Sequence, residues 1–187
     1  MEANTLPETL HWRDWSGYGL EHAVLRKKAG YIEVQSAVIC DPVHAGFAAL
    51  YSLRLDSGWC VIDLQASLIG TAESIYLRRT EEGHWFDGNN RSLLHLNGIF
   101  DVDLSITPFT NSLPIRRLKL RIGESAEIVT AYVAFPQLMV SLDSQRYTRV
   151  AVDRYRYESL DSDFVREITV DCNGLVVTYP GLFQRIE

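Results

Sequence analysis

GFAALYSLRL-DSG-WCVIDLQASL, residues 46–68, gives the clearest indication of the fold class. Apolar residues recur at every second position in 46–55 and again in 59–68, which is the period of a β-strand with one buried face. Between the two runs stand Asp56, Ser57 and Gly58, residue types that suit a tight turn. The stretch therefore predicts a β-hairpin.

The same period-two pattern continues along the chain, broken by Gly, Asn and Asp. A second clear hairpin is predicted over 164–179, with its turn at 171–174. The predicted strands cover residues 10–15, 20–27, 31–39, 46–55, 59–68, 73–80, 84–86, 99–106, 117–122, 126–135, 146–151, 154–159, 164–170 and 175–179. We expect an all-β fold, a single domain over 1–187, in which a large antiparallel curved sheet forms a barrel or half-barrel with few short helices.

The composition is that of a globular protein. The chain has 187 residues, 47% of them hydrophobic, which is enough for a core that needs neither metal nor disulfide. Its first residues lack the basic and apolar regions of a secretory signal, and no run approaches the roughly 18 apolar residues of a membrane-spanning helix. These features predict a cytoplasmic protein that does not span a membrane.

The cysteines and histidines give no sign of a metal site. Cys40, Cys60 and Cys172 are widely spaced and form no Cys-x-x-Cys pair, so we predict that they are reduced, buried thiols. The five histidines show none of the spacings that bind zinc. We therefore expect neither a metal nor another cofactor.

The charge of the chain argues against nucleic acid as a partner. Lys and Arg number 18 against 24 Asp and Glu, a formal net charge of −6. In 146–147 and 154–157 arginines alternate with tyrosines, which sends the two residue types to opposite faces and separates phosphate contacts from base stacking. An anionic ligand would need a local basic patch.

The most unusual stretch is DVDLSITPFTNSLPIRRL, residues 101–118. Its first part alternates and predicts a strand that places Asp101 and Asp103 on one face, about 7 Å apart. Two prolines then bracket small residues that bind backbone groups, which predicts a rigid loop from Thr107 to Pro114.

A strand over 117–122 is expected to follow this loop, with Arg117, Lys119 and Arg121 on its outer face. Arg116 would then share the apolar face. Because an unpaired buried guanidinium is costly, we expect Arg116 to meet Asp101 or Asp103, or to reach the mouth of a cavity.

Several segments resemble a bacterial family once listed as a domain of unknown function and now called putative glycolipid-binding. They are 107–118 (TPFTNSLPIRRL), 145–147 (QRY), 155–157 (YRY), 174–183 (GLVVTYPGLF) and the opening Trp15-x-x-x-Gly19-x-Glu21. The resemblance covers nearly the whole chain. It implies an all-β fold similar to bacterial lipoprotein carriers and lipid-binding lipoproteins, with a hydrophobic cavity.

We therefore predict that the chain binds an amphipathic molecule, a glycolipid or acyl-chain lipid, without catalysis, in an apolar cavity of the curved sheet. A ten-carbon chain would contribute roughly 8 kcal/mol before ordering costs. The candidate ligand-binding residues are Asn111, Arg116, Arg117, Trp15, Trp59 and Tyr132.

Two alternatives stay open. One is a hydrolase acting on a sugar or lipid ester, with Asp101, Asp103 or a histidine as acid or base, since carboxylates about 7 Å apart suit glycoside chemistry. The other is a structural or interaction protein in which the aromatic residues only fill the core.

Overall fold

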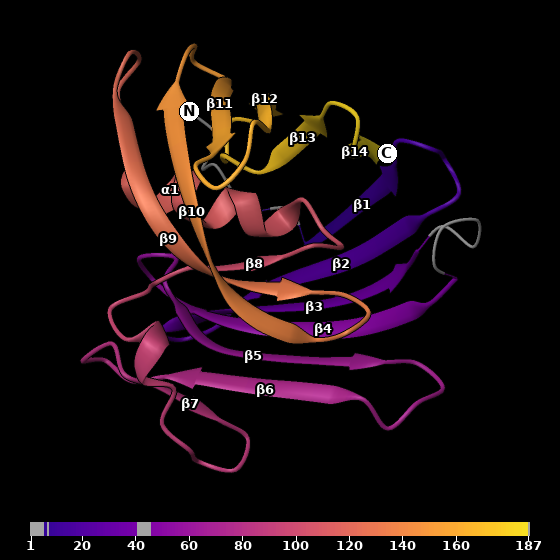
Figure 1. The fold of residues 1–187 in the computed structure, drawn as a ribbon. Coiled ribbons are helices and arrows are strands. Elements are labelled where there is room, and N and C mark those ends of the chain that lie inside the picture. Colours follow the sequence, from indigo (N-terminus) through magenta and orange to yellow (C-terminus); the bar gives the residue numbers. More distant parts are fainter. Residues whose placement is uncertain (1–5, 7, 41–45, 187) are drawn as a thin grey trace.

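The computed structural model describes residues 6, 8–40 and 46–186, and most of them belong to one sheet of 14 strands (Figure 1). In chain order the strands are β1 (Thr9–Asp14), β2 (Leu20–Lys27), β3 (Tyr31–Ile39), β4 (Ala48–Asp56), β5 (Val61–Leu68), β6 (Ser74–Arg79), β7 (Trp85–Asp87), β8 (Val102–Leu104), β9 (Ser125–Ala134), β10 (Met139–Arg149), β11 (Arg154–Ser159), β12 (Val165–Val170), β13 (Val176–Tyr179) and β14 (Phe183–Ile186).

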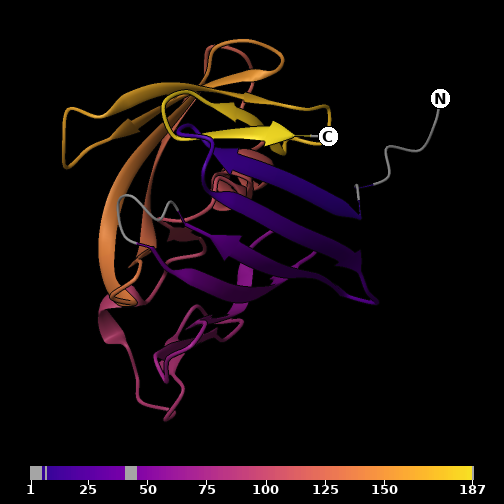
Figure 2. The same cartoon turned by 90° about the vertical axis from the view of Figure 1, so that its right-hand side faces the viewer.

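Two meanders, joined where β1 pairs with β14, make up the sheet. The order is β7-β6-β5-β4-β3-β2-β1-β14-β13-β12-β11-β10-β9-β8, so β7 and β8 are the open edges. The pairs between named strands are antiparallel except for β8 with β9, which is parallel. Figures 1 and 2 show the sheet curving around a central helix. The all-β curved sheet is confirmed, and of the two predicted forms the open half-barrel is present.

Both predicted hairpins are present. β4 pairs with β5 in a register that places Leu53 opposite Leu64, and β12 pairs with β13. Along β4 every second side chain is buried on the concave face. The Asp56 carboxylate fixes the turn between β4 and β5 by accepting the backbone N–H groups of Gly58 at 2.8 Å and Cys60 at 3.0 Å.

The segment after β8 differs from the prediction. Residues 109–111 form a 3-10 helix, η2 (Phe109–Asn111), which continues into α1 (Ser112–Leu118), so the predicted loop over 107–114 and strand over 117–122 are wrong. Pro114 lies in the first turn of α1, where its missing N–H removes no helical hydrogen bond. Lys119 then ends the helix in the left-handed conformation, with φ of 51°.

This helical segment, η2 with α1, fills the concave side of the half-barrel, and we call it the plug. Residues 106–115 are all buried. Phe109 and Leu113 pack into the larger core cluster, which is formed mainly by β1 to β6, β8 and β9. Ile115 packs into the second cluster, with Tyr147 and Ile168 of β10 and β12. The chain itself thus occupies the interior that the sequence suggested as a ligand container.

Some smaller expectations also change. β10 begins at Met139, well before the predicted residue 146, β8 is shorter than predicted, and β14 was not predicted. Cys40 and Cys60 are half-buried and Cys172 is exposed, so the prediction of buried thiols is wrong for Cys172.

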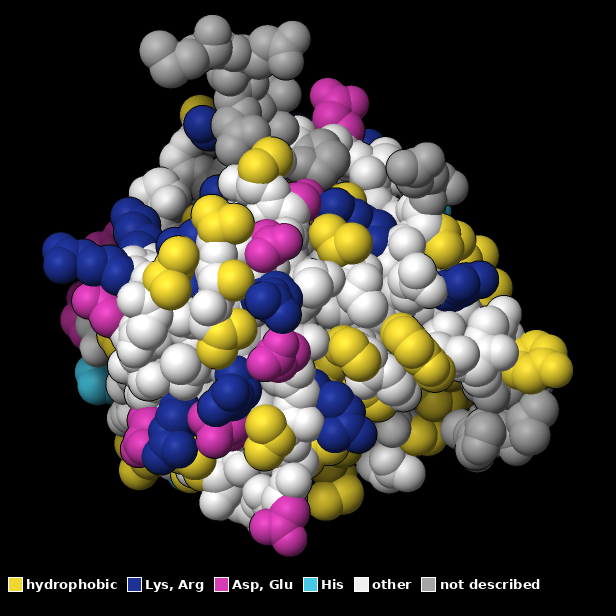
Figure 3. Space-filling model, turned by 90° about the horizontal axis from the view of Figure 1, so that it is seen from above, with side chains coloured by type: hydrophobic (Ala, Val, Ile, Leu, Met, Phe, Trp, Pro, Cys, Tyr) yellow, Lys and Arg dark blue, Asp and Glu magenta, His cyan; other side chains and the backbone are white. Residues whose placement is uncertain are grey.

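The outer face of β9 to β12 carries paired charges. Arg146 forms ion pairs with Glu127 and Glu158 at 2.6 and 3.6 Å, and Arg154 pairs with Glu167 at 3.4 Å. Figure 3 shows basic and acidic side chains interspersed over the face seen from above. The tyrosines of 147, 155 and 157 are buried on the opposite face, which confirms the predicted alternation of arginine and tyrosine.

Candidate ligand-binding site

An apolar cavity of about 460 Å³ opens at the side of the half-barrel. It lies where the β1–β2 turn, the end of β3 and the turn into β14 approach the segment between β8 and η2. Its volume falls within the range of small-molecule sites, about 300–1,000 Å³. The cavity therefore lies beside the plug, at one edge of the concave face.

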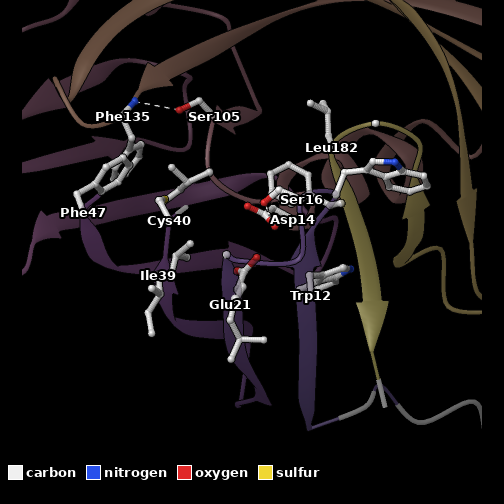
Figure 4. A pocket seen from close by; sticks show the side chains of 17 residues that line it. Trp12, Asp14, Ser16, Glu21, Ile39, Cys40, Phe47, Ser105, Phe135 and Leu182 are labelled. Atoms are coloured by element: carbon white, nitrogen blue, oxygen red, sulfur yellow. Dashed lines mark hydrogen bonds between the residues drawn. The ribbon is translucent and has the colours of Figure 1, made fainter. Parts of the chain in front are cut away.

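Aromatic side chains form much of the cavity wall (Figure 4). The rings of Phe47 and Phe135 are stacked, with centroids 6.4 Å apart and planes 10° from parallel. Towards the other end lies Trp12, which is fully buried and donates its indole N–H to the Val176 carbonyl at 2.9 Å. Because this donor is already satisfied, Trp12 adds apolar packing to the wall and no unpaired polar group.

The carboxyl group of Glu21 is buried in this wall. Glu21 of β2 is 3% exposed, and its Oε1 accepts hydrogen bonds from the Ser36 hydroxyl at 2.8 Å and the Tyr51 hydroxyl at 2.6 Å. Its Oε2 is also buried and has no hydrogen-bond partner among the described residues. A buried polar atom without a partner costs free energy, so Oε2 is a point at which a ligand group would be stabilised.

Glu21 gains or loses its proton near pH 7. Burial raises the pKa of Glu21 from 4.5 to about 7, against the opposing effect of the neighbouring hydroxyl groups of Thr107, Tyr51 and Ser36. Around pH 7 the carboxyl group can therefore donate from, or accept at, the unpartnered oxygen.

The β1–β2 turn brings a second carboxylate to the cavity. Asp14 Oδ1 accepts hydrogen bonds from the Ser16 hydroxyl at 2.8 Å and the Gly17 N–H at 2.7 Å. A Cβ on Gly19 would lie 2.7 Å from Asp14 Oδ2 and 3.1 Å from the Ile39 carbonyl oxygen, so a larger residue here would force the Asp14 carboxylate to shift. Burial, helped by Asp14 and Glu21, raises the pKa of the Cys40 thiol to about 11, which keeps it protonated and unreactive.

The mouth of the cavity is apolar and open. Trp15 is 53% exposed and Leu182 is 38% exposed, and both line the cavity. Exposed apolar side chains at a cavity entrance allow an apolar ligand to enter without crossing a polar barrier.

A smaller polar recess, of about 160 Å³, adjoins the apolar cavity. The two share Ser105, Leu182 and Phe183 as lining residues, so they lie next to each other with these residues between them. The remaining lining of the recess is largely polar or aromatic and comprises Asp103, Leu104, Thr107, Asn111, Tyr132, Tyr157, Phe164 and Tyr179. Tyrosine rings with hydroxyl and carboxylate groups suit a ligand that combines flat apolar surface with hydroxyl groups.

Asp103 is the charged group of the recess. Its Oδ1 accepts from the Thr110 hydroxyl at 2.9 Å, and its Oδ2 accepts from the Gln145 amide at 2.7 Å. Burial raises the pKa of Asp103 to about 6, with smaller contributions from Asp143 and Asp101 and opposition from the two hydrogen bonds.

Hydrogen bonds from the 107–118 motif attach the plug to the sheet. Asn111 donates to the Tyr147 hydroxyl at 2.9 Å, and Tyr147 donates to the Gln145 side chain at 3.3 Å. The Ser112 hydroxyl accepts the backbone N–H of Val176 at 3.1 Å. The motif residues that resemble the family therefore hold the plug in place.

The structure separates the predicted ligand-binding residues into three places. Trp15 lines the apolar cavity, and Asn111 and Tyr132 line the polar recess. Trp59 and Arg116 line a different recess at the end of α1, and neither they nor Arg117 line the apolar cavity.

Arg117, rather than Arg116, is the partner of the buried Asp101. Its Nε lies 3.2 and 3.1 Å from the two carboxylate oxygens, and its terminal nitrogen is also bonded to Asp101. The expected pairing of Arg116 with Asp101 or Asp103 is wrong, because residues 116 and 117 lie on a helix and point about 100° apart rather than alternating along a strand.

Glu21 was predicted only as part of the opening Trp15-x-x-x-Gly19-x-Glu21, and its position in the cavity wall was not predicted. A signal was present: Glu21 is in phase with Ala23 and Leu25 in the predicted strand 20–27, and all three are buried. A carboxyl group on the apolar face of a strand must find a partner or lie in a cavity.

Fold and site together define an all-β protein with an open sheet, an internal helical plug, a lateral apolar cavity and an adjoining polar recess. A family model described as "Putative glycolipid-binding" matches residues 9–185, and the chain belongs to this family.

The crystal structure of a DUF1089 family protein from Pseudomonas aeruginosa is similar, with 34% sequence identity and a TM-score of 0.75. The match covers 89% of this chain and 92% of that one. A search of curated proteins gives no match. Within the described residues, no helix is long and apolar enough to cross a membrane, and no cluster of three or more His, Cys, Asp or Glu side chains is placed to hold a metal ion.

Proposed function

We propose that this chain binds an amphipathic glycolipid or acyl lipid without reacting with it. The apolar chain occupies the cavity between Trp12 and Phe135, and a hydroxyl-bearing head group, such as a sugar, occupies the recess beside Asp103. The observation that carries the proposal is the buried, unpartnered Oε2 of Glu21 in the wall of an apolar cavity that lies next to a tyrosine-lined recess.

The energetics favour a ligand of this kind. Each buried CH₂ contributes about 0.8 kcal/mol, so the apolar chain supplies most of the affinity with few directional contacts. Glu21 and Asp103 then favour hydroxyl groups, which can both donate and accept, over head groups that only accept. The description of the family points in the same direction.

The carboxyl pair of the hydrolase alternative, Asp101 and Asp103, is engaged within the protein. Asp101 is engaged by Arg117 and does not line the cavity, and both oxygens of Asp103 accept side-chain hydrogen bonds. The arrangement of two free carboxyl groups that glycoside chemistry requires is therefore not formed by this pair.

The apolar part of the proposal is tested by placing a charge at the mouth. Leu182→Asp is expected to weaken binding of a fluorescent acyl probe about tenfold or more, because the carboxylate must lie against the apolar chain. Leu160→Asp is the matched control, since both leucines are 38% exposed and only Leu182 lines the cavity. Equal affinities of the two variants would refute binding in this cavity.

The head-group part is tested by comparing decyl glucoside with decanol. The glucoside is expected to bind more tightly, and Tyr132→Phe is expected to reduce that difference, since the variant removes a hydroxyl from the recess while keeping the ring. Mass spectrometry of lipids that co-purify with the protein identifies the natural ligand. If decanol binds as tightly as decyl glucoside to the unmodified chain, the sugar-binding role of the recess is refuted.

A further inference from the structure

A third recess, of about 560 Å³, lies at the end of α1 and shares no lining residue with the apolar cavity or the polar recess. Three cationic side chains line it: Arg116, Lys119 and Arg149. None of them forms an ion pair with a carboxylate elsewhere in the described part of the chain. The chain as a whole carries a net charge of −6, so this concentration of positive charge is local.

Backbone carbonyl groups hold Arg149 in place. Its guanidinium donates to the carbonyls of Leu120 at 3.0 Å, Ala151 at 3.2 Å and Val152 at 2.7 Å. These acceptors fix the geometry of the group without neutralising its charge. Arg149 therefore contributes a positioned positive charge to the wall of the recess.

Arg116 is held by an aromatic ring instead. Its guanidinium carbon lies 4.0 Å from the centroid of the Trp59 ring, and its Nε is buried without a hydrogen-bond partner among the described residues. Burial lowers the pKa of Arg116, because desolvation disfavours the charged form. Trp59 has φ of 69°, an unusual conformation for a bulky residue that is often found at ligand clamps.

The acidic residue that lines this recess, Asp171, is already engaged. Asp171 also lines the recess and opposes the fall in the Arg116 pKa. However, its Oδ2 accepts from Arg185 at 2.8 Å, and its Oδ1 accepts the backbone N–H groups of Asn173 and Leu175, both at 2.9 Å. Asp171 is thus committed to its own loop and leaves the three cations in excess.

We propose that this recess is a second binding site, which takes a phosphate oxyanion carried by a small molecule or a lipid head group. Arg116 supplies the unpartnered Nε–H and Lys119 a mobile ammonium group, and Arg149 adds a fixed charge. A phosphate oxygen would accept a hydrogen bond from the Arg116 Nε–H, which has no partner among the described residues. This charge-assisted hydrogen bond would offset the free-energy cost of burying the guanidinium. The site is independent of the lipid cavity and does not require it.

The test titrates the full chain with inorganic phosphate and follows amide chemical shifts by NMR. We expect saturable shifts in residues of the recess, 57–59, 116–119 and 171–174. Lys119→Asn is expected to weaken binding about tenfold, and asparagine tolerates the left-handed conformation of residue 119, so the fold is retained. Arg121→Ala is the control, because this arginine is 89% exposed and does not line the recess.

Two results would overturn the proposal. One is the absence of saturable shifts at millimolar phosphate, and the other is an equal loss of affinity in Lys119→Asn and Arg121→Ala, which would indicate non-specific charge attraction.

Sedimentation with vesicles of phosphatidylcholine, with and without phosphatidic acid, distinguishes the two sources of phosphate. Binding to phosphatidic acid vesicles that Lys119→Asn weakens assigns the site to a lipid head group. Binding of free phosphate alone assigns it to a soluble ligand. If decyl glucoside binding fails while phosphate binding persists, the lipid proposal falls and this site stands.

Discussion

Replacing Glu21 by glutamine should change how the stability of the protein depends on pH. The pKa of Glu21 is raised from 4.5 to about 7 in the folded state because the carboxyl group is buried. Below pH 4.5 the group is protonated in both the folded and the unfolded chain, so it has no pH-dependent effect. As pH rises towards 7 the unfolded chain loses this proton first, so the folded state is progressively disfavoured.

The size of the effect follows from the two pKa values. Each pH unit between them is worth about 1.4 kcal/mol, so the folded state loses about 3 kcal/mol between pH 4.5 and pH 7. Above pH 7 the loss is complete and the contribution becomes constant. Glutamine keeps an acceptor for Ser36 and Tyr51 but does not titrate, so the Glu21→Gln variant should lack this loss.

The assay is urea unfolding of the ligand-free protein and the variant at pH 5, 6, 7 and 8. Asp103 also has a raised pKa, but it is present in both proteins and cancels in the comparison. We expect the free energy of unfolding of the unmodified chain to fall by about 3 kcal/mol more than that of the variant between pH 5 and pH 8. Parallel pH profiles of the two proteins would show that Glu21 is not a buried, neutral group at low pH and would refute the reasoning.

Three further predictions concern the fold, each measured by urea unfolding. Phe109→Ala should lower the free energy of unfolding by about 3–5 kcal/mol, because the ring is fully buried in the plug; a loss below 1 kcal/mol would contradict the central place of the plug. Arg117→Met should lower the free energy of unfolding by about 3–5 kcal/mol, because it leaves Asp101 buried and unpaired. The loss should be smaller at pH 5 than at pH 8, because burial raises the pKa of Asp101. A loss that does not depend on pH would contradict this. Gly19→Ala should cost about 1–3 kcal/mol, since its Cβ would lie 2.7 Å from Asp14 Oδ2, and unchanged stability would show that the turn relaxes freely.

Strands with one buried face were predictable from the sequence, and strands without one were not. β2 and β3 match their predicted bounds because buried and exposed residues alternate along them. β14 was missed because all four of its residues are half-buried, so its sequence carries no alternation. The first half of β10, from Met139 to Ser144, was missed for the same reason. Its residues are exposed or half-buried, and none of them is buried.

The plug was not predictable as a helix because it is too short for helical periodicity. α1 has seven residues and follows a single 3-10 turn, while Pro108 and Pro114 suggest a loop when the sequence is considered alone. The wrong strand at 117–122 then assigned Arg116 the position that Arg117 holds. The prediction therefore gave Arg116 the ion pair with Asp101 that Arg117 forms, an error of one residue along the chain.

The motif that resembles the family and the residues that form the cavity have different physical tasks. Thr110, Asn111 and Ser112 are buried and bonded to the protein itself, so they determine that the plug fills the half-barrel. The mouth of the apolar cavity is instead lined by rim residues such as Trp15 and Leu182, whose side chains are partly exposed. Substitutions at the rim should therefore alter ligand choice at little cost in stability, whereas substitutions in the motif should unfold the protein before they reveal anything about its ligand. Relatives that keep the motif but differ at the rim are expected to share this fold and to bind different lipids.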